Sequence, residues 1–171
     1  LLETHGRQLI SGKFQRGAPA ARVLDLAIHT MLEELAPNLW EDSLERLVDY
    51  GHVFSMELEM DMLFHDKLYH GEAVAIDMAF SSVLAHVRGE LDEATLDASL
   101  RILRNLGLPI YHQQFNAAMA NTAMYERVKF SSGQKVPLPI GRGVAHIVND
   151  ITAEQIQEAL DVWRCRCAEA Q

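Results

Sequence analysis

The spacing of apolar residues along the chain predicts a mainly helical protein. Over residues 20–35, apolar side chains recur at three- and four-residue steps, which is the repeat of an amphipathic helix. Residues 71–88 are apolar on nearly every face, so we expect this helix to lie at the centre of the domain. Asp92 can cap a further helix, which the pattern ends at Gly107.

The segments between these helices carry weaker helical patterns. Asp42 and Ser43 are expected to cap a short amphipathic helix that runs to about residue 50. A further helical stretch should follow and end near Met60, and residues 113–124 read as another short helix. The sequence therefore predicts a domain built from several helices of unequal length.

A small β element and a last helix are expected near the C-terminal end. Residues 127–140 and 144–148 read as two short strands around glycine-containing turns. Thr152 and Gln155 have the spacing of a capping box before a final amphipathic helix. The expected fold class is mainly α with a small two-stranded β element.

Composition limits the classes of function. The chain has 171 residues, of which 49% are hydrophobic, and we expect residues 1–171 to form one domain. With 24 acidic and 15 basic residues its net charge is −9, which disfavours nucleic acids and anionic membranes as partners. Cys165 and Cys167 are too close for a strain-free disulfide, so we expect free thiols, as in a reducing cytoplasm.

The beginning of the chain resembles the inside of a helix. Leu1-Leu2-Glu3 opens the sequence without an initiator methionine. We therefore expect the chain to be the C-terminal part of something longer, or a segment separated from its other half.

Two histidines stand out because each lies beside a glycine at the expected start of a helix. These are His52, after Gly51, and His70, before Gly71. Neutral imidazoles are good zinc ligands, but a catalytic zinc site needs about three protein ligands. Spacing alone therefore leaves a shared metal as one alternative and structural histidines as the other. Structural or surface roles are expected for His5, His29, His86 and His146.

Two other patterns carry weaker hypotheses. The dipeptide His65-Asp66 resembles the central pair of metal-dependent phosphohydrolases, but the flanking residues do not have the required spacing. A basic cluster around the expected strands could hold a phosphate or simply balance an acidic chain. Its members are Arg127, Lys129, Lys135 and Arg142.

Two motifs together resemble one enzyme family. Residues 46–59, which contain Gly51-His52, and residues 70–78, which open with His-Gly-Glu, are similar to the C-terminal domain of sugar-phosphate cyclases of the 3-dehydroquinate synthase superfamily. Weaker similarity spans nearly the whole chain. The resemblance implies a largely helical domain that binds metal and substrate. The N-terminal Rossmann-like domain, which binds NAD in this family, would lie outside this chain.

The resemblance also implies a reaction and its partners. His52 and His70 would bind a catalytic Zn²⁺ or Co²⁺, with a glutamate from the preceding part of the protein as third ligand. The family reaction is a phosphate-eliminating lyase step on a sugar phosphate, in which NAD is regenerated and the ring closes by intramolecular aldol addition. Expected partners are the sugar-phosphate substrate, the N-terminal Rossmann-like domain or chain, and a second copy in a homodimer. The isolated chain should be inactive.

Two positions point to a subgroup. Dehydroquinate-forming members carry Asn at the position of Asp49 and His at that of Met56, whereas Asp49 and residues 76–78 resemble sedoheptulose 7-phosphate cyclases, particularly 2-epi-5-epi-valiolone synthases. The expected activity is therefore conversion of sedoheptulose 7-phosphate to a C7 cyclitol. The alternatives are 3-dehydroquinate synthase or another sugar-phosphate cyclase, and a non-catalytic helical module derived from one.

Further site residues follow from the same resemblance. Asp49 is expected to be catalytic and to bind a substrate hydroxyl, with a structural role at a helix end as the alternative. Glu59 is expected to be catalytic, and Glu59 and Glu72 could instead orient ligands or cap helices. Met56 should form part of the pocket wall, and Lys129 should contact the substrate phosphate.

Overall fold

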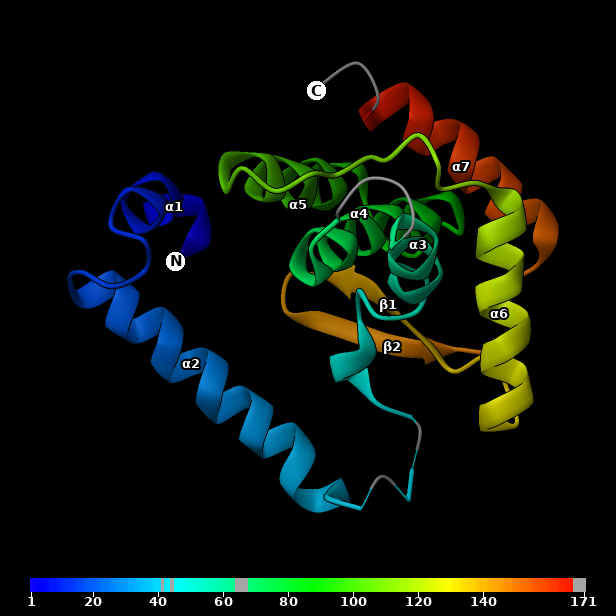
Figure 1. The fold of residues 1–171 in the computed structure, drawn as a ribbon, viewed down its shortest axis with the longest axis horizontal. Coiled ribbons are helices and arrows are strands. Elements are labelled where there is room, and N and C mark those ends of the chain that lie inside the picture. The colour runs from blue at the N-terminus through cyan, green and yellow to red at the C-terminus, as the bar shows by residue number, and fades with distance from the viewer. Residues whose placement is uncertain (41, 44, 64–67, 168–171) are drawn as a thin grey trace.

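A computed structural model describes residues 1–40, 42–43, 45–63 and 68–167, which form a mainly helical domain (Figure 1). Among these residues, no helix combines the length and the apolar character that a membrane span requires. The helices, 3₁₀ turns and strands are α1 (Leu2–Ser11), α2 (Ala18–Leu35), η1 (Ala36–Asn38), η2 (Leu47–Asp49), α3 (Ser55–Met62), α4 (His70–Val87), α5 (Glu93–Asn105), α6 (Ala117–Ser131), β1 (Val136–Gly141), β2 (Val144–Val148) and α7 (Ala153–Cys167).

The central element is α4, as the all-round apolar pattern predicts. Eleven of its residues are buried, and it packs against α3, α5, α7 and β1. The ring of Phe80 lies 5.1 Å from that of Phe54, 5.0 Å from that of Phe115 and 5.8 Å from that of Trp163, centroid to centroid, in edge-to-face arrangements. Such pairs add to the free energy gained from burying the rings. The aromatic cluster therefore fixes α4 at the middle of the domain.

Two of the predicted helix starts are confirmed in atomic detail. The side chain of Asp92 accepts a hydrogen bond from the amide of Thr95, 2.9 Å away, at the start of α5. The amide of Thr152 donates to Gln155 Oε1 over 3.1 Å, and Gln155 returns a bond to Thr152 Oγ1 over 3.3 Å. Gly107, with φ +70°, follows the end of α5 as predicted.

The β element is an antiparallel hairpin that packs against α4 through β1 (Figure 1). β2 has the predicted bounds, whereas the predicted first strand, 127–140, is wrong over its first nine residues, because β1 begins at Val136 and the first five of the nine belong to α6. Apolar and basic residues alternate from Arg127 to Phe130 and imitate a strand, but helix α6 is already capped at Asn116 and extends through them. Ser132 then adopts a left-handed conformation and ends the helix.

The predicted short helix after Asp42 and Ser43 is also wrong, because the described residues from 42 to 50 contain no α-helix and form the 3₁₀ turn η2 at Leu47–Asp49. Asn38 holds Ser43 in a loop: its Nδ2 donates to the Ser43 carbonyl, and the Ser43 amide donates to its Oδ1 over 3.0 Å. Ser43 is therefore a loop residue instead of a helix cap. Leu44, an apolar residue within the predicted helix, lies outside the described residues.

The helix predicted over residues 20–35 is confirmed as α2, but its apolar side chains are exposed. Ala20 is the one residue of α2 that is buried. In Figure 1, α2 extends away from the group formed by α3 to α7. Trp40, shortly after its end, is 84% exposed. The exposed large apolar side chains of α2 are Leu24, Leu26, Ile28, Met31 and Leu32.

Candidate metal centre

The loop that carries His52 approaches α4 closely. Gly51 has φ +85°, and a Cβ atom at this position would lie 2.7 Å from Met78 Cγ and 3.0 Å from Val74 Cγ1. Glycine is therefore required both by the backbone conformation and by the contact with α4. The neighbouring Tyr50 hydroxyl lies 2.8 Å from Ser82 Oγ, also on α4. Burial of this hydroxyl raises the pKa of Tyr50 to about 12.

The second histidine, His70, is the first residue of α4. Glu72 accepts a hydrogen bond from the amide of Tyr69 over 2.9 Å, so its predicted alternative role as a helix cap is confirmed. His70 Nδ1 lies 2.8 Å from Oε2 of Glu59, which comes from α3. Because Glu59 engages Nδ1, Nε2 is the nitrogen of His70 that can ligate a metal.

The fold brings His52 and His70 together. Their ring centroids are 5.3 Å apart with the planes tilted by 52°, and both side chains are exposed. Two adjacent imidazoles, one held by a carboxylate on its other nitrogen, have the chemistry of a partial zinc site. Within the described residues, no group of three His, Cys, Asp or Glu side chains could hold a metal. The described residues therefore fit two ligands of a divalent metal, one fewer than the three that a catalytic zinc site needs.

Asp49 lies directly before this centre and is buried between two arginines. Its Oδ1 is 2.9 Å from Arg46 Nη2, and its Oδ2 is 2.9 Å from Arg127 Nη2. Its backbone carbonyl accepts the amide of His52 over 2.8 Å. Since both carboxylate oxygens are engaged by guanidinium groups, the geometry favours the structural alternative that the sequence left open for Asp49.

Arg127 is a residue that the sequence pattern singled out only as part of a basic cluster. Its guanidinium group also donates to the backbone carbonyls of Gln134, over 2.8 Å, and Lys135, over 2.9 Å. Arg127 thus connects η2, the end of α6 and the start of β1. Arg142 pairs with Glu3 at 3.1 Å. The ion pairs of Arg127 with Asp49 and of Arg142 with Glu3 favour charge balance over phosphate binding for these two arginines.

The remaining predicted site residues lie on exposed positions. Met56 is on the first turn of α3, shortly after His52, and is 65% exposed. Lys129 is near the end of α6, where its Nζ lies 3.2 Å from Glu126 Oε2 and 5.1 Å from the centre of the Phe130 ring. Substrate binding by Met56 and Lys129 stays a prediction.

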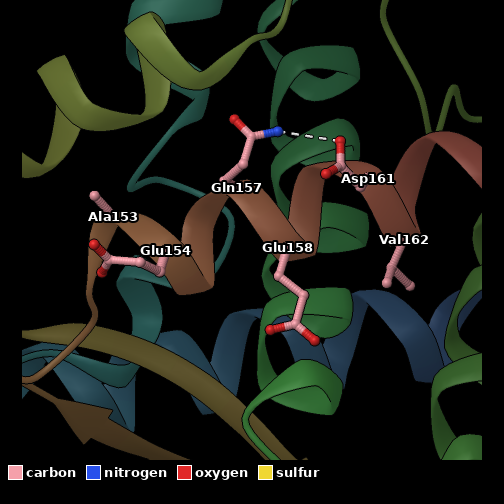
Figure 2. A pocket seen from close by; sticks show the side chains of 6 residues that line it. All are labelled: Ala153, Glu154, Gln157, Glu158, Asp161 and Val162. Atoms are coloured by element: carbon pink, nitrogen blue, oxygen red, sulfur yellow. Dashed lines mark hydrogen bonds between the residues drawn. The ribbon is translucent and has the colours of Figure 1, made fainter.

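Other candidates from the sequence do not join this centre. His65 and Asp66 lie outside the described residues. His29, His86 and His146 each contact a backbone carbonyl or a carboxylate, which is the structural role expected of them. A hollow on the outer face of α7 contains none of the predicted site residues (Figure 2). It is lined by Ala153, Glu154, Gln157, Glu158, Asp161 and Val162.

Comparison with known proteins places residues 6–130 in the family model described as 3-dehydroquinate synthase C-terminal. The chain is 47% identical over 165 residues to a 2-epi-5-epi-valiolone synthase from Actinoplanes sp., and the match covers 93% of this chain and 41% of the relative. It is 30% identical over 97 residues to a 3-dehydroquinate synthase from Streptomyces avermitilis, covering 57% of this chain and 26% of that relative.

A solved structure with a similar fold is ValA, a 2-epi-5-epi-valiolone synthase from Streptomyces hygroscopicus subsp. jinggangensis 5008 with NAD⁺ and Zn²⁺ bound. The TM-score is 0.91 at 48% sequence identity, and the match covers 96% of this chain and 45% of ValA. The chain therefore spans about two fifths of the length of the curated 2-epi-5-epi-valiolone synthases that it matches.

Proposed function

This chain belongs to the 3-dehydroquinate synthase family and corresponds to the C-terminal domain of its members. From that premise we propose that it is the metal- and substrate-binding domain of a sedoheptulose 7-phosphate cyclase. The observation that carries the proposal is the pairing of His52 and His70, whose ring centroids are 5.3 Å apart, with Glu59 behind His70. The higher identity with 2-epi-5-epi-valiolone synthases than with a 3-dehydroquinate synthase supports a C7 cyclitol product.

In this proposal His52 and His70 supply two ligands to a Zn²⁺ or Co²⁺ ion. A bound divalent cation would polarise the oxygens of the substrate during oxidation and ring closure. Glu59 accepts the Nδ1 proton of His70, which leaves the Nε2 lone pair free for the metal and fixes the plane of the ring. We assign Glu59 to this orienting role, because its carboxylate contacts the ligand.

The other predicted residues take supporting roles. Asp49 holds the amide of His52 through its carbonyl and joins the loop to Arg127 through its carboxylate. Met56, exposed beside this loop, would form part of the pocket wall, and Lys129 would contact the substrate phosphate. NAD and the third metal ligand would come from a part of the protein outside these 171 residues.

The exposed apolar side of α2 supports a partner of that kind. Relatives of this chain are more than twice as long as the segment that it matches, and an additional domain must pack somewhere. Leu24, Ile28 and Leu32 lie four residues apart on α2 and are each more than half exposed. We propose that the N-terminal NAD-binding part covers this stripe. The expected homodimer would form between two copies of the protein that each contain both parts.

A direct test measures phosphate release by the protein with its NAD-binding part present, supplied with NAD and Zn²⁺. Sedoheptulose 7-phosphate should be turned over, and the heptulosonate precursor of dehydroquinate should not. His52→Ala and His70→Ala should each lose bound zinc and activity. His146→Ala is the matched control, because His146 pairs with Glu90 beyond the opposite end of α4. Turnover of the dehydroquinate precursor alone would reverse the choice of subgroup, and no turnover of either substrate would favour the non-catalytic module.

A further inference from the structure

A buried carboxylate on α4, that of Asp77, contacts the segment that follows His52. Asp77 is 2% exposed in a helix whose neighbouring side chains are apolar or small. Its Oδ2 accepts hydrogen bonds from the backbone amides of Phe54 and Ser55, the latter over 2.9 Å. Its Oδ1 accepts from Ser81 Oγ over 2.8 Å. Both oxygens of this buried group therefore have defined partners.

These contacts make Asp77 the cap of a different helix. The first amides of α3 have no partner within their own helix, and such amides are usually capped by the side chain just before the helix. Here that residue is Phe54, which has no capping side chain. The carboxylate of Asp77 does this from across the helix interface, where the positive end of the α3 dipole also favours it.

A buried carboxylate is a costly way to cap a helix. Burial raises the pKa of Asp77, while the hydrogen bonds from Ser81, Phe54 and Ser55 lower it. A Ser or Asp at position 54 could cap α3 without burying a carboxyl group. The unusual feature is that the cap comes from α4, so it fixes α3 and the preceding loop to that particular helix.

Asp77 joins α4, which begins with His70, to the segment that directly follows the His52 loop. His52 lies two residues before Phe54, and His70 lies two helical turns before Asp77 on the same helix. On the other side of His52, Tyr50 and Gly51 are attached to α4 by a hydrogen bond and a close contact. The His52 loop is thus attached to α4 on both sides.

We propose that Asp77 is a positioning residue of the metal centre: by holding the amides of Phe54 and Ser55, it sets where His52 stands relative to His70. This inference rests on the proposed function, since it concerns the same two histidines. It differs from a purely structural role, which would lower stability without changing the geometry of the metal.

The test uses the protein with its NAD-binding part present and Co²⁺ as the probe, because the visible spectrum of Co²⁺ reports ligand geometry. Asp77→Ala should weaken Co²⁺ binding roughly 10–100-fold and change the visible bands. Asp77→Asn should restore both, since its amide oxygen can accept the same two backbone hydrogen bonds. Asp77→Ser, whose side chain is too short to reach both amides, should behave like Asp77→Ala and replaces it if that variant does not fold.

Asn116→Ala is the matched control. The Asn116 side chain caps α6 through the amides of Ala118 and Met119, so its loss removes a helix cap of the same kind from an element that carries neither His52 nor His70. It should lower the melting temperature and leave the Co²⁺ spectrum unchanged. Folded Asp77→Ala or Asp77→Ser with a wild-type spectrum and affinity within twofold would overturn the inference.

The proposed function fails separately. If the unsubstituted protein does not bind Co²⁺, or if His52→Ala binds it with the same affinity, the proposed metal centre is overturned and the positioning role of Asp77 with it. If binding requires both histidines but is indifferent to Asp77, only the positioning role is lost.

Discussion

Two helices of equal length, α2 and α4, have opposite surroundings. Each has 18 residues and a largely apolar sequence, yet eleven residues of α4 are buried against one in α2. The apolar residues of α4 meet α3, α5, α7 and β1, whereas Leu24, Ile28 and Leu32 of α2 face outward. An apolar repeat thus shows that a helix has a face to bury, and the rest of the fold determines whether the partner lies within the same domain.

The same contrast separates stability from association. α4 begins with the proposed ligand His70 and carries Asp77, so the helix at the centre of the core also carries two residues of the proposed metal centre. α2 contributes little buried surface to this domain and leaves its apolar residues exposed, where we propose that the NAD-binding part covers them. Substitutions in α4 should therefore affect folding and site geometry together, and those in α2 should affect association.

The largest difference is expected between Phe80→Ala and Ile28→Ala. The ring of Phe80 is fully buried among three aromatic rings, so its loss should lower the free energy of unfolding by about 3–5 kcal/mol. Ile28 is 57% exposed, and its truncation should cost no more than about 0.5 kcal/mol in this chain alone. Urea denaturation of both variants measures the difference. Losses of similar size would show that α2 is packed in solution and would break the comparison.

A smaller effect is expected at high pH on the α4 side of the molecule. Cys167 is buried on α7, which packs against α4, and burial raises its pKa from 9.0 to about 11. The neutral thiol is favoured in the folded state, so its contribution to stability is complete below pH 9 and is lost as the pH rises through about 11. Two pKa units correspond to roughly 3 kcal/mol at most.

The exposed neighbour Cys165 supplies the control for this titration. Between pH 8 and 11.5, wild type and Cys165→Ala should lose stability in parallel, and Cys167→Ala should lose less. Denaturation series at several pH values measure the three curves. A constant gap between wild type and Cys167→Ala over this range would contradict a buried neutral thiol.

Much of the fold can be predicted from the sequence where local and tertiary signals agree. α4 is apolar on all sides and is buried on all sides, and β2 has its predicted bounds. The predictions fail where a local pattern competes with a neighbour: Arg127 to Phe130 alternate like a strand, but α6 extends through them. Ser43 has the chemistry of a cap and is instead held by Asn38.

The candidate site shows the same limit. His52 and His70 are recognisable from their motifs, and the structure brings them together. Asp77 and Arg127 act through partners 22 to 78 positions away, which a sequence pattern does not display. One signal was available for Asp77, because a carboxylate within an all-round apolar helix needs a buried partner. No local signal connects Arg127 with Asp49.

The smallest expected effect concerns the stripe on α2. Leu32 is 58% exposed, so Leu32→Ala should leave the unfolding of the isolated chain nearly unchanged. If the NAD-binding part covers α2, the same substitution should weaken its association with the chain about tenfold, which corresponds to about 1.4 kcal/mol. Calorimetric titration of the two parts measures the affinity, with Glu33→Gln on the same helix as the control. An unchanged affinity for Leu32→Ala would mean that the partner binds another surface, and the apolar residues of α2 would then require a different occupant, such as a second copy of the chain.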